Sequence, residues 1–158
     1  MLKKYKSYLI AILIPLLVGV TSAISTIGNM NLEEKFKMPP LAPQAIIFPI
    51  VWTLLYILMG VSSGIVFNSN SANESSKITA LFIYALSLVF NFFWSIIFFN
   101  INAFLFAFIW LIVLWILILN TIIKYYKISK IAAYLQLPYL LWVTFAGYLN
   151  FAIWYLNR

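Results

Sequence analysis

The fold of this chain is decided by an uncharged stretch of 46 residues, Ile78–Ile123, which reads ITALFIYALSLVFNFFWSIIFFNINAFLFAFIWLIVLWILILNTII. As one helix it would extend about 69 Å at about 1.5 Å per residue, roughly twice the hydrocarbon core of a bilayer. The stretch must therefore fold back on itself. Its polar break, Asn100-Ile101-Asn102, predicts two antiparallel membrane-spanning helices, over 78–99 and 103–123.

Three more uncharged runs are each long enough to cross a bilayer, and they predict spans over 7–28, 44–67 and 131–157. Prolines precede the 44–67 run and the polar turn Asn68–Ser71 ends it. The runs are apolar on every face, whereas the strands of a membrane barrel alternate apolar and polar residues. The sequence therefore predicts an all-α integral membrane bundle of five transmembrane helices, forming one domain over residues 1–158.

The composition of the whole chain agrees with a membrane protein. Hydrophobic residues make up 65% of the chain, charged residues make up 8%, and the mean hydropathy is +1.04. A soluble domain needs more polar surface than this to face water. The composition therefore excludes a soluble domain, and the net charge of +7 does not imply a nucleic-acid partner.

The first apolar run has an alternative interpretation. Lys3–Lys6 followed by an apolar run also resembles a signal peptide, with Thr21-Ser22-Ala23 as the cleavage site. The run continues to Ile27 at full spanning length, and this favours a helix that is retained.

The cationic residues predict how the bundle is oriented. Five spans place the two termini on opposite sides of the membrane, and cytoplasmic loops carry an excess of Lys and Arg. We therefore expect an inner-membrane protein with a cytoplasmic N-terminus and an outer C-terminus, in contact with anionic lipid headgroups and not with nucleic acid. Seven cations fall on the N-terminal side and three on the other: Lys3, Lys4, Lys6, Lys77, Lys124, Lys127 and Lys130, against Lys35, Lys37 and Arg158.

Reactive side chains are missing from the predicted spans. The five spans contain no Asp, Glu, Lys, Arg or His, and the whole chain contains no histidine or cysteine. Ion-coupled transporters and proton pumps work through such intramembrane residues. The sequence therefore predicts no metal site and no resident cofactor, and any reactivity must come from a ligand or from light.

Aromatic residues are abundant instead, with 14 Phe, 10 Tyr and 6 Trp. On three predicted helices, aromatic, amide and small residues recur at helical spacing, so those on one helix share a face. If the three faces converge, they line a cavity suited to a large, flat, apolar molecule. The alternative is ordinary helix packing, with the two asparagines bonding across helices. The candidate ligand-binding residues are Phe48, Trp52, Tyr56, Asn91, Trp94, Tyr139, Trp142, Ala146 and Asn150.

Three blocks of sequence resemble one known family. They are PPLAP at 39–43 with FPIVWTLLYILMG at 48–60, NFFWS at 91–95, and PYLLWVTFA at 138–146 running on to Leu149-Asn150. Their order and spacing resemble those of the TspO/MBR family, the tryptophan-rich sensory or translocator proteins. The resemblance covers essentially the whole chain.

This resemblance implies a five-helix bundle, often a homodimer, that binds porphyrins such as protoporphyrin IX in a pocket capped by the first extramembrane loop. Trp52 and Trp142 match two pocket tryptophans that members use in light-dependent porphyrin breakdown, so they are the candidate catalytic residues. Asn91 matches a ligand-contacting asparagine, and Ala146 matches a small pocket residue. Leu41 departs from the pattern, because many members have a loop tryptophan there.

Three functions are compatible with the resemblance. The first is a protein that binds and senses a tetrapyrrole, and the absence of histidine favours an iron-free porphyrin. The second is a slow photochemical enzyme, in which excited porphyrin and oxygen react beside Trp52 and Trp142. The third is a transporter or carrier of small apolar solutes.

Overall fold

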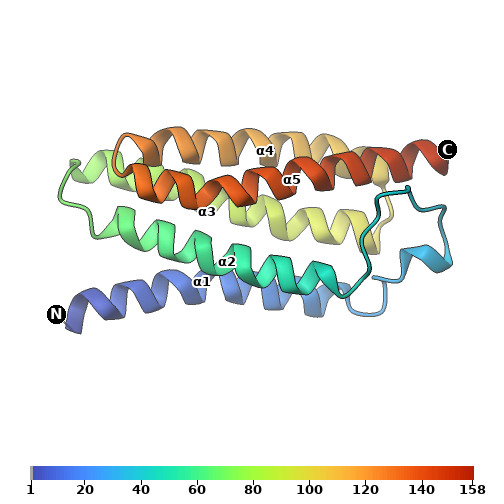
Figure 1. Ribbon diagram of the computed structural model, residues 1–158, viewed down its shortest axis with the longest axis horizontal. Coiled ribbons are helices and arrows are strands. Elements are labelled where there is room, and N and C mark those ends of the chain that lie inside the picture. The colour runs from blue at the N-terminus through green and yellow to red at the C-terminus, as the bar shows by residue number, and fades with distance from the viewer. Residues whose placement is uncertain (1) are drawn as a thin grey trace.

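The computed structural model describes residues 2–158, and this part of the chain contains five long helices and no strand (Figure 1). Each long helix is long and apolar enough to cross a membrane, so the predicted fold class is confirmed. Two short elements accompany them, a 3-10 helix η1 and a π-helix η2. The bounds are α1 Leu2–Thr26, η1 Leu32–Glu34, α2 Ile47–Phe67, α3 Glu74–Ser95, η2 Ile96–Asn100, α4 Phe104–Tyr126 and α5 Lys130–Leu156.

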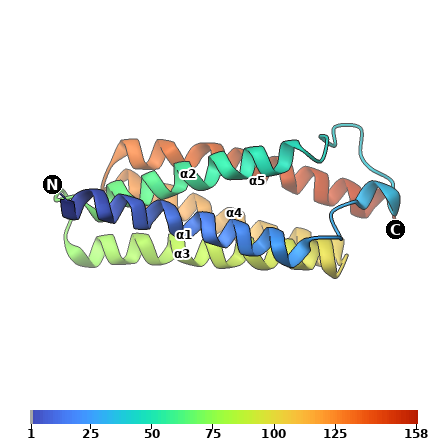
Figure 2. The same ribbon diagram turned by 90° about the horizontal axis from the view of Figure 1, so that it is seen from below.

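The five long helices form a closed ring. Around this ring α1 packs against α2, α2 against α5, α5 against α4, α4 against α3, and α3 against α1. Figures 1 and 2 show the helices running along one common axis, with the two chain termini at opposite ends. The end near the C-terminus also carries the α1–α2 loop and the α3–α4 turn, and we refer to it as the C-terminal end of the bundle.

The bundle has an apolar exterior as well as an apolar core. Large side chains such as Ile24, Phe82 and Leu141 are more than half exposed on the outside. Polar side chains such as Gln136 and Asn150 lie buried inside. A water-soluble protein distributes its residues the other way, so this surface is made for lipid.

The helix α3 begins at Glu74, earlier than the predicted start at residue 78. The Asn73 side chain caps it by accepting a hydrogen bond from the Ser76 N–H at 2.8 Å. Lys77 therefore lies in the first helical turn and not in a loop, and its buried ammonium pairs with the Glu74 carboxylate at 2.6 Å. The predicted helix started too late because its start was placed directly after the charged residue Lys77.

The turn between α3 and α4 is built by asparagine. The helix continues beyond the predicted end at residue 99 as the π-helix η2, in which the Asn100 amide donates to the Ser25 carbonyl of α1 at 2.8 Å. Asn102 then adopts a positive φ of 55°, a conformation that asparagine tolerates better than most residues. The predicted polar break is therefore the turn itself, and α4 begins at Phe104.

The other bounds also differ from the predicted ones. α1 covers Leu2–Thr26, where 7–28 was predicted, and α2 begins at Ile47 because Gln44 starts a turn in which its carbonyl accepts from the Ile47 N–H at 2.9 Å. α4 extends to Tyr126, and α5 runs from Lys130 to Leu156.

Glycines let α1 and α2 pack closely. A Cβ atom added to Gly60 would overlap the backbone of Ile12 in α1, and one added to Gly64 would lie 2.6 Å from the Tyr8 ring. The spacing of four residues is the small-xxx-small pattern of close membrane-helix pairs. In α1, Gly19 leaves the space that the Tyr56 ring occupies. This packing fixes the position of α2, which carries much of the candidate site.

Candidate ligand-binding site

Five aromatic rings from two neighbouring helices meet where α2 packs against α5. On α2 the Trp52 ring stacks on Tyr56, with 5.5 Å between centroids and 28° between planes. It also presents an edge to Tyr139 of α5 at 6.1 Å. Phe48 meets Trp142 of α5 edge to face at 5.9 Å. We call these residues the α2–α5 ring cluster, and all five were predicted ligand-binding residues.

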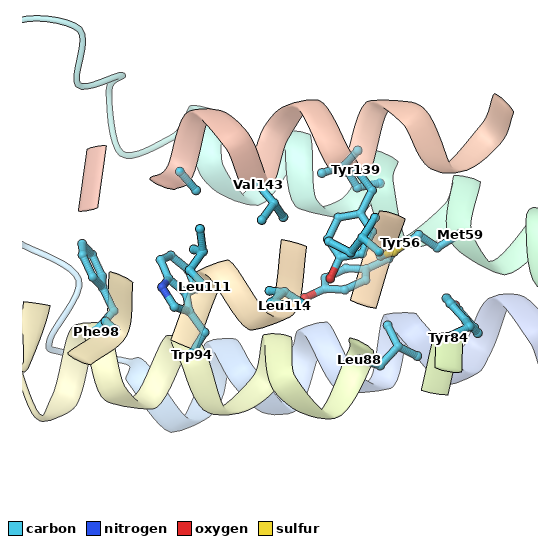
Figure 3. Packing of buried hydrophobic residues seen from close by; sticks show 14 of the residues in the cluster. Tyr56, Met59, Tyr84, Leu88, Trp94, Phe98, Leu111, Leu114, Tyr139 and Val143 are labelled. Carbon is cyan, nitrogen blue, oxygen red and sulfur yellow. The ribbon is translucent and has the colours of Figure 1, made fainter. Parts of the chain in front are cut away.

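Burial divides the ring cluster into an inner and an outer part. Tyr56 and Tyr139 are 7% and 1% exposed, and Figure 3 shows both reaching from their helices into the interior of the bundle. Phe48, Trp52 and Trp142 are only half-buried. The outer rings can therefore be reached by a ligand at the α2–α5 seam, whereas the inner ones are packed against protein.

Asn91 of α3 supports the ring cluster from the other side of the bundle. Its side chain is buried, and the amide nitrogen donates to the Tyr56 hydroxyl at 3.1 Å. Tyr56 in turn carries the stacked ring of Trp52. Trp52, Tyr56 and Asn91 are therefore linked in one chain of contacts that joins α2 to α3.

Trp94 and Asn150 lie in a separate group of contacts with Phe98 and Phe104, which we call the second cluster. The Trp94 indole N–H donates to the Asn150 carbonyl oxygen at 3.2 Å, and the Asn150 amide donates to the Phe104 backbone carbonyl at 2.7 Å. The Trp94 ring stacks on Phe98 at 5.1 Å and not on a ring of the α2–α5 cluster. This pair joins α3, α4 and α5, as the packing alternative expects. Its role in ligand binding stays a prediction.

Ala146 is buried on α5, one helical turn beyond Trp142 and one before Asn150. It therefore lies on the face that connects the ring cluster to the second cluster.

The loop between α1 and α2 crosses the C-terminal end of the bundle toward α5 and returns to α2 (Figure 1). The Asn157 side chain pairs with the Lys37 backbone twice, accepting from its N–H at 2.9 Å and donating to its carbonyl at 3.0 Å. Phe36 packs edge-on against Phe104 at 4.9 Å. The loop leads into α2, which begins at Ile47 next to Phe48, so these contacts attach the segment that precedes the ring cluster.

Sequence reasoning missed several polar side chains that hold this region. The Gln136 amide donates to the Ser62 hydroxyl at 3.2 Å, and that hydroxyl donates to the Ala132 carbonyl at 2.7 Å. These contacts join α2 to α5 near the N-terminal end of α5. Gln136 and Ser62 are polar residues within apolar runs, and this was the only sequence signal that could have predicted their structural role. No sequence signal distinguished Asn157.

The residues of the site determine what it can bind. The ring cluster offers π faces and edges and two buried phenol hydroxyls, and it contains no ionisable carboxylate or amine. The Tyr56 hydroxyl is paired with Asn91, and the Tyr139 hydroxyl has no hydrogen-bond partner among the described residues. Such a surface suits a flat, apolar, π-rich molecule held by stacking and burial. Within residues 2–158 no cluster of three metal-ligating side chains is found.

The fold and the ring cluster together define a class of protein, a five-helix membrane protein with a tryptophan-rich site between its second and fifth helices. Comparison with known proteins gives the family. A sequence profile of the TspO/MBR family matches residues 11–156, and the chain belongs to this family.

Relatives from all three domains of life resemble the chain. A tryptophan-rich protein TspO from Archaeoglobus fulgidus is 37% identical over 152 residues, which cover 93% of this chain and 94% of that protein. A protein of the same name from Chlorobaculum tepidum is 39% identical over 120 residues, covering 75% of each chain. The translocator protein of Bos taurus is 29% identical over 147 residues, covering 92% and 87%. These names indicate a membrane protein of sensor or transporter type.

Proposed function

We propose that this protein binds an iron-free porphyrin at the outer part of the α2–α5 ring cluster and acts as a membrane sensor of that ligand. One observation carries the proposal, the convergence of the half-buried rings of Phe48, Trp52 and Trp142 on one seam. Aromatic faces that remain partly exposed within an apolar seam can stack on a macrocycle, and burial of that macrocycle adds to the binding energy.

The surroundings of the ring cluster fit the ring system of a porphyrin better than they fit an iron centre. The chain has no histidine or cysteine, which are the usual strong axial ligands of haem iron. Stacking needs no such ligand. We therefore expect protoporphyrin IX to bind at least as tightly as haem.

A sensor must convert binding into a change elsewhere in the molecule. Trp52 stacks on Tyr56, and Tyr56 accepts a hydrogen bond from Asn91 of α3. A porphyrin that displaces Trp52 would shift Tyr56 and so alter the α2–α3 contact. Binding at the α2–α5 seam would in this way change the position of α3, a helix that does not line the seam.

The test is a titration of the detergent-solubilised protein with protoporphyrin IX, followed by the porphyrin absorption band. We expect saturable binding that is weakened at least tenfold by Trp52→Phe combined with Trp142→Phe. The matched control is Trp110→Phe, because that tryptophan stacks on Phe90 outside the α2–α5 seam. Binding that fails to saturate, or equal affinities for all three proteins, would contradict the proposal.

The translocator name of the mammalian relatives favours a second candidate, a carrier of small apolar solutes. Flux of protoporphyrin across liposome membranes, blocked by the same double substitution, would support the carrier. Binding without flux would support the sensor. A photochemical enzyme would instead convert illuminated bound porphyrin to a defined product, and Trp52→Phe would abolish this conversion while binding remained.

A further inference from the structure

A groove follows the α4–α5 seam on the outside of the bundle, away from the α2–α5 ring cluster. Its inner part has a volume of about 410 Å³ and is lined by side chains that include Leu111, Ile112 and Val143. Gly147 also lines it, and a Cβ atom added there would lie 3.2 Å from a Leu111 methyl group. The absence of a side chain at Gly147 therefore helps to keep this part of the seam open.

The lining of the inner part of the groove is mostly apolar, and its polar side chains are Trp115, Thr144 and Tyr148, the last of them 44% exposed. The Trp115 indole N–H donates to the Thr144 hydroxyl at 2.9 Å. That hydroxyl donates in turn to the Leu140 carbonyl at 2.8 Å. The inner part is thus suited to hydrocarbon.

A second hollow of about 580 Å³ lies on the same pair of helices, at the C-terminal end of the bundle. The Phe151 ring lines the inner groove and packs 5.4 Å from Trp154, which lines this hollow. Unlike the inner part of the groove, this hollow is lined by amide and cationic side chains, namely Asn102, Asn157 and Arg158. The two hollows therefore follow each other along the α4–α5 seam, and the one at the end of the bundle forms a polar and cationic mouth.

Arg158 supplies the charge at that mouth. Its guanidinium lies 4.2 Å from the Tyr155 ring centroid and 5.7 Å from that of Trp154. These contacts hold the cation over aromatic faces, and within residues 2–158 it has no ion pair with an acidic side chain. Its hydrogen-bond donors remain available to an anion.

The dimensions match one half of a bilayer. The lining residues on α4 run from Phe104 to Trp115, which is about 16 Å of helix at about 1.5 Å per residue. One leaflet contributes roughly half of the hydrocarbon core of about 30 Å. We propose that this groove is a specific site for one anionic phospholipid, with its headgroup at Arg158 and an acyl chain along the α4–α5 seam.

The charge selects this occupant over others. An uncharged lipid offers the guanidinium no anion, and the phosphate of a zwitterionic lipid is already neutralised by the cation of its own headgroup. A cation at the membrane surface favours an anionic headgroup by about fivefold in affinity. The inference concerns a surface separate from the ring cluster, so it does not depend on porphyrin binding.

The test uses the full-length delipidated protein in detergent, offered phosphatidylglycerol and phosphatidylcholine with identical acyl chains and observed by native mass spectrometry. We expect one retained phosphatidylglycerol, preferred about fivefold over phosphatidylcholine. Arg158→Gln should abolish the preference, and Lys35→Gln should not, because Lys35 is a loop cation at the same end that does not line the groove. No preference in the wild type, or one that survives Arg158→Gln, would overturn the proposal.

The acyl-chain part of the site has its own pair of variants. Ile112 lines the groove and Ile116 does not, yet both are surface residues of α4, 44% and 48% exposed. Ile112→Trp should lower retention of both phospholipids at least threefold, and Ile116→Trp should not. If Ile112→Trp instead changes the oligomeric state and leaves lipid retention unchanged, the groove is a contact between two copies of the chain and the proposal is wrong.

Discussion

Asn150→Leu tests how the second cluster holds three helices together. The side chain is fully buried and makes two interhelical hydrogen bonds, one with the Trp94 indole and one with the Phe104 carbonyl. Leucine has a similar size, so it creates little cavity but leaves the indole N–H without its partner. Interhelical bonds in membranes contribute about 0.6 kcal/mol on average and at most about 1.7 kcal/mol. For two bonds we expect a loss of about 1 to 3 kcal/mol.

The assay is reversible unfolding in mixed detergent micelles, followed by far-UV circular dichroism. Asn120→Leu is the matched control, because that exposed asparagine bonds only to Ile116 of its own helix. A double-mutant cycle with Trp94→Phe then isolates one bond, with an expected coupling of about 0.6 kcal/mol. Equal stability losses for the two asparagine variants, or zero coupling with Trp94→Phe, would refute the idea that Asn150 joins the helices.

Three further predictions follow from buried groups. Tyr139→Phe should leave stability unchanged or raise it by about 1 kcal/mol, because its buried hydroxyl has no hydrogen-bond partner among residues 2–158. Tyr56→Phe should lower stability because it removes the partner of a buried amide, and denaturation of both variants tests this pair of predictions. Gly60→Val should destabilise the bundle by about 1 to 3 kcal/mol through overlap with α1, measured as a lower unfolding midpoint. Asn157→Leu should release the loop and speed tryptic cleavage after Lys37 severalfold without altering helix content; an unchanged cleavage rate would mean that other contacts hold the loop.

The sequence predicted the number and order of the helices because both follow from where the charges are absent. A run of 46 uncharged residues can be accommodated in a bilayer in one way only, as two helices. The helix ends were harder to predict, because individual side chains set them. The Asn73 cap places the start of α3 at Glu74. At the other end of this helix, the hydrogen bond from the Asn100 amide to the Ser25 carbonyl accompanies the continuation as the π-helix η2.

The candidate site was predictable only to the level of a helix face. Phe48, Trp52 and Tyr56 are four residues apart, so they lie on one face of α2. This spacing is enough to predict that they contribute to the same site. The sequence does not reveal how far each helix is rotated against its neighbours. That rotation makes Trp52 half-buried, and it turns Trp94 toward Asn150 and away from the ring cluster.

The contacts around the bundle also indicate where a large ligand can enter. The α1–α2 seam is closed by backbone packed at Gly60, and the second cluster joins α3, α4 and α5. The α2–α5 seam is hydrogen-bonded through Ser62 and Gln136 at one end only. At the other end its rings meet by apolar contact, and the loop beside it is attached through Asn157 to α5. Ring contacts separate without leaving a buried polar group unpaired, so opening this half of the α2–α5 seam costs less than opening the half that is hydrogen-bonded through Ser62 and Gln136.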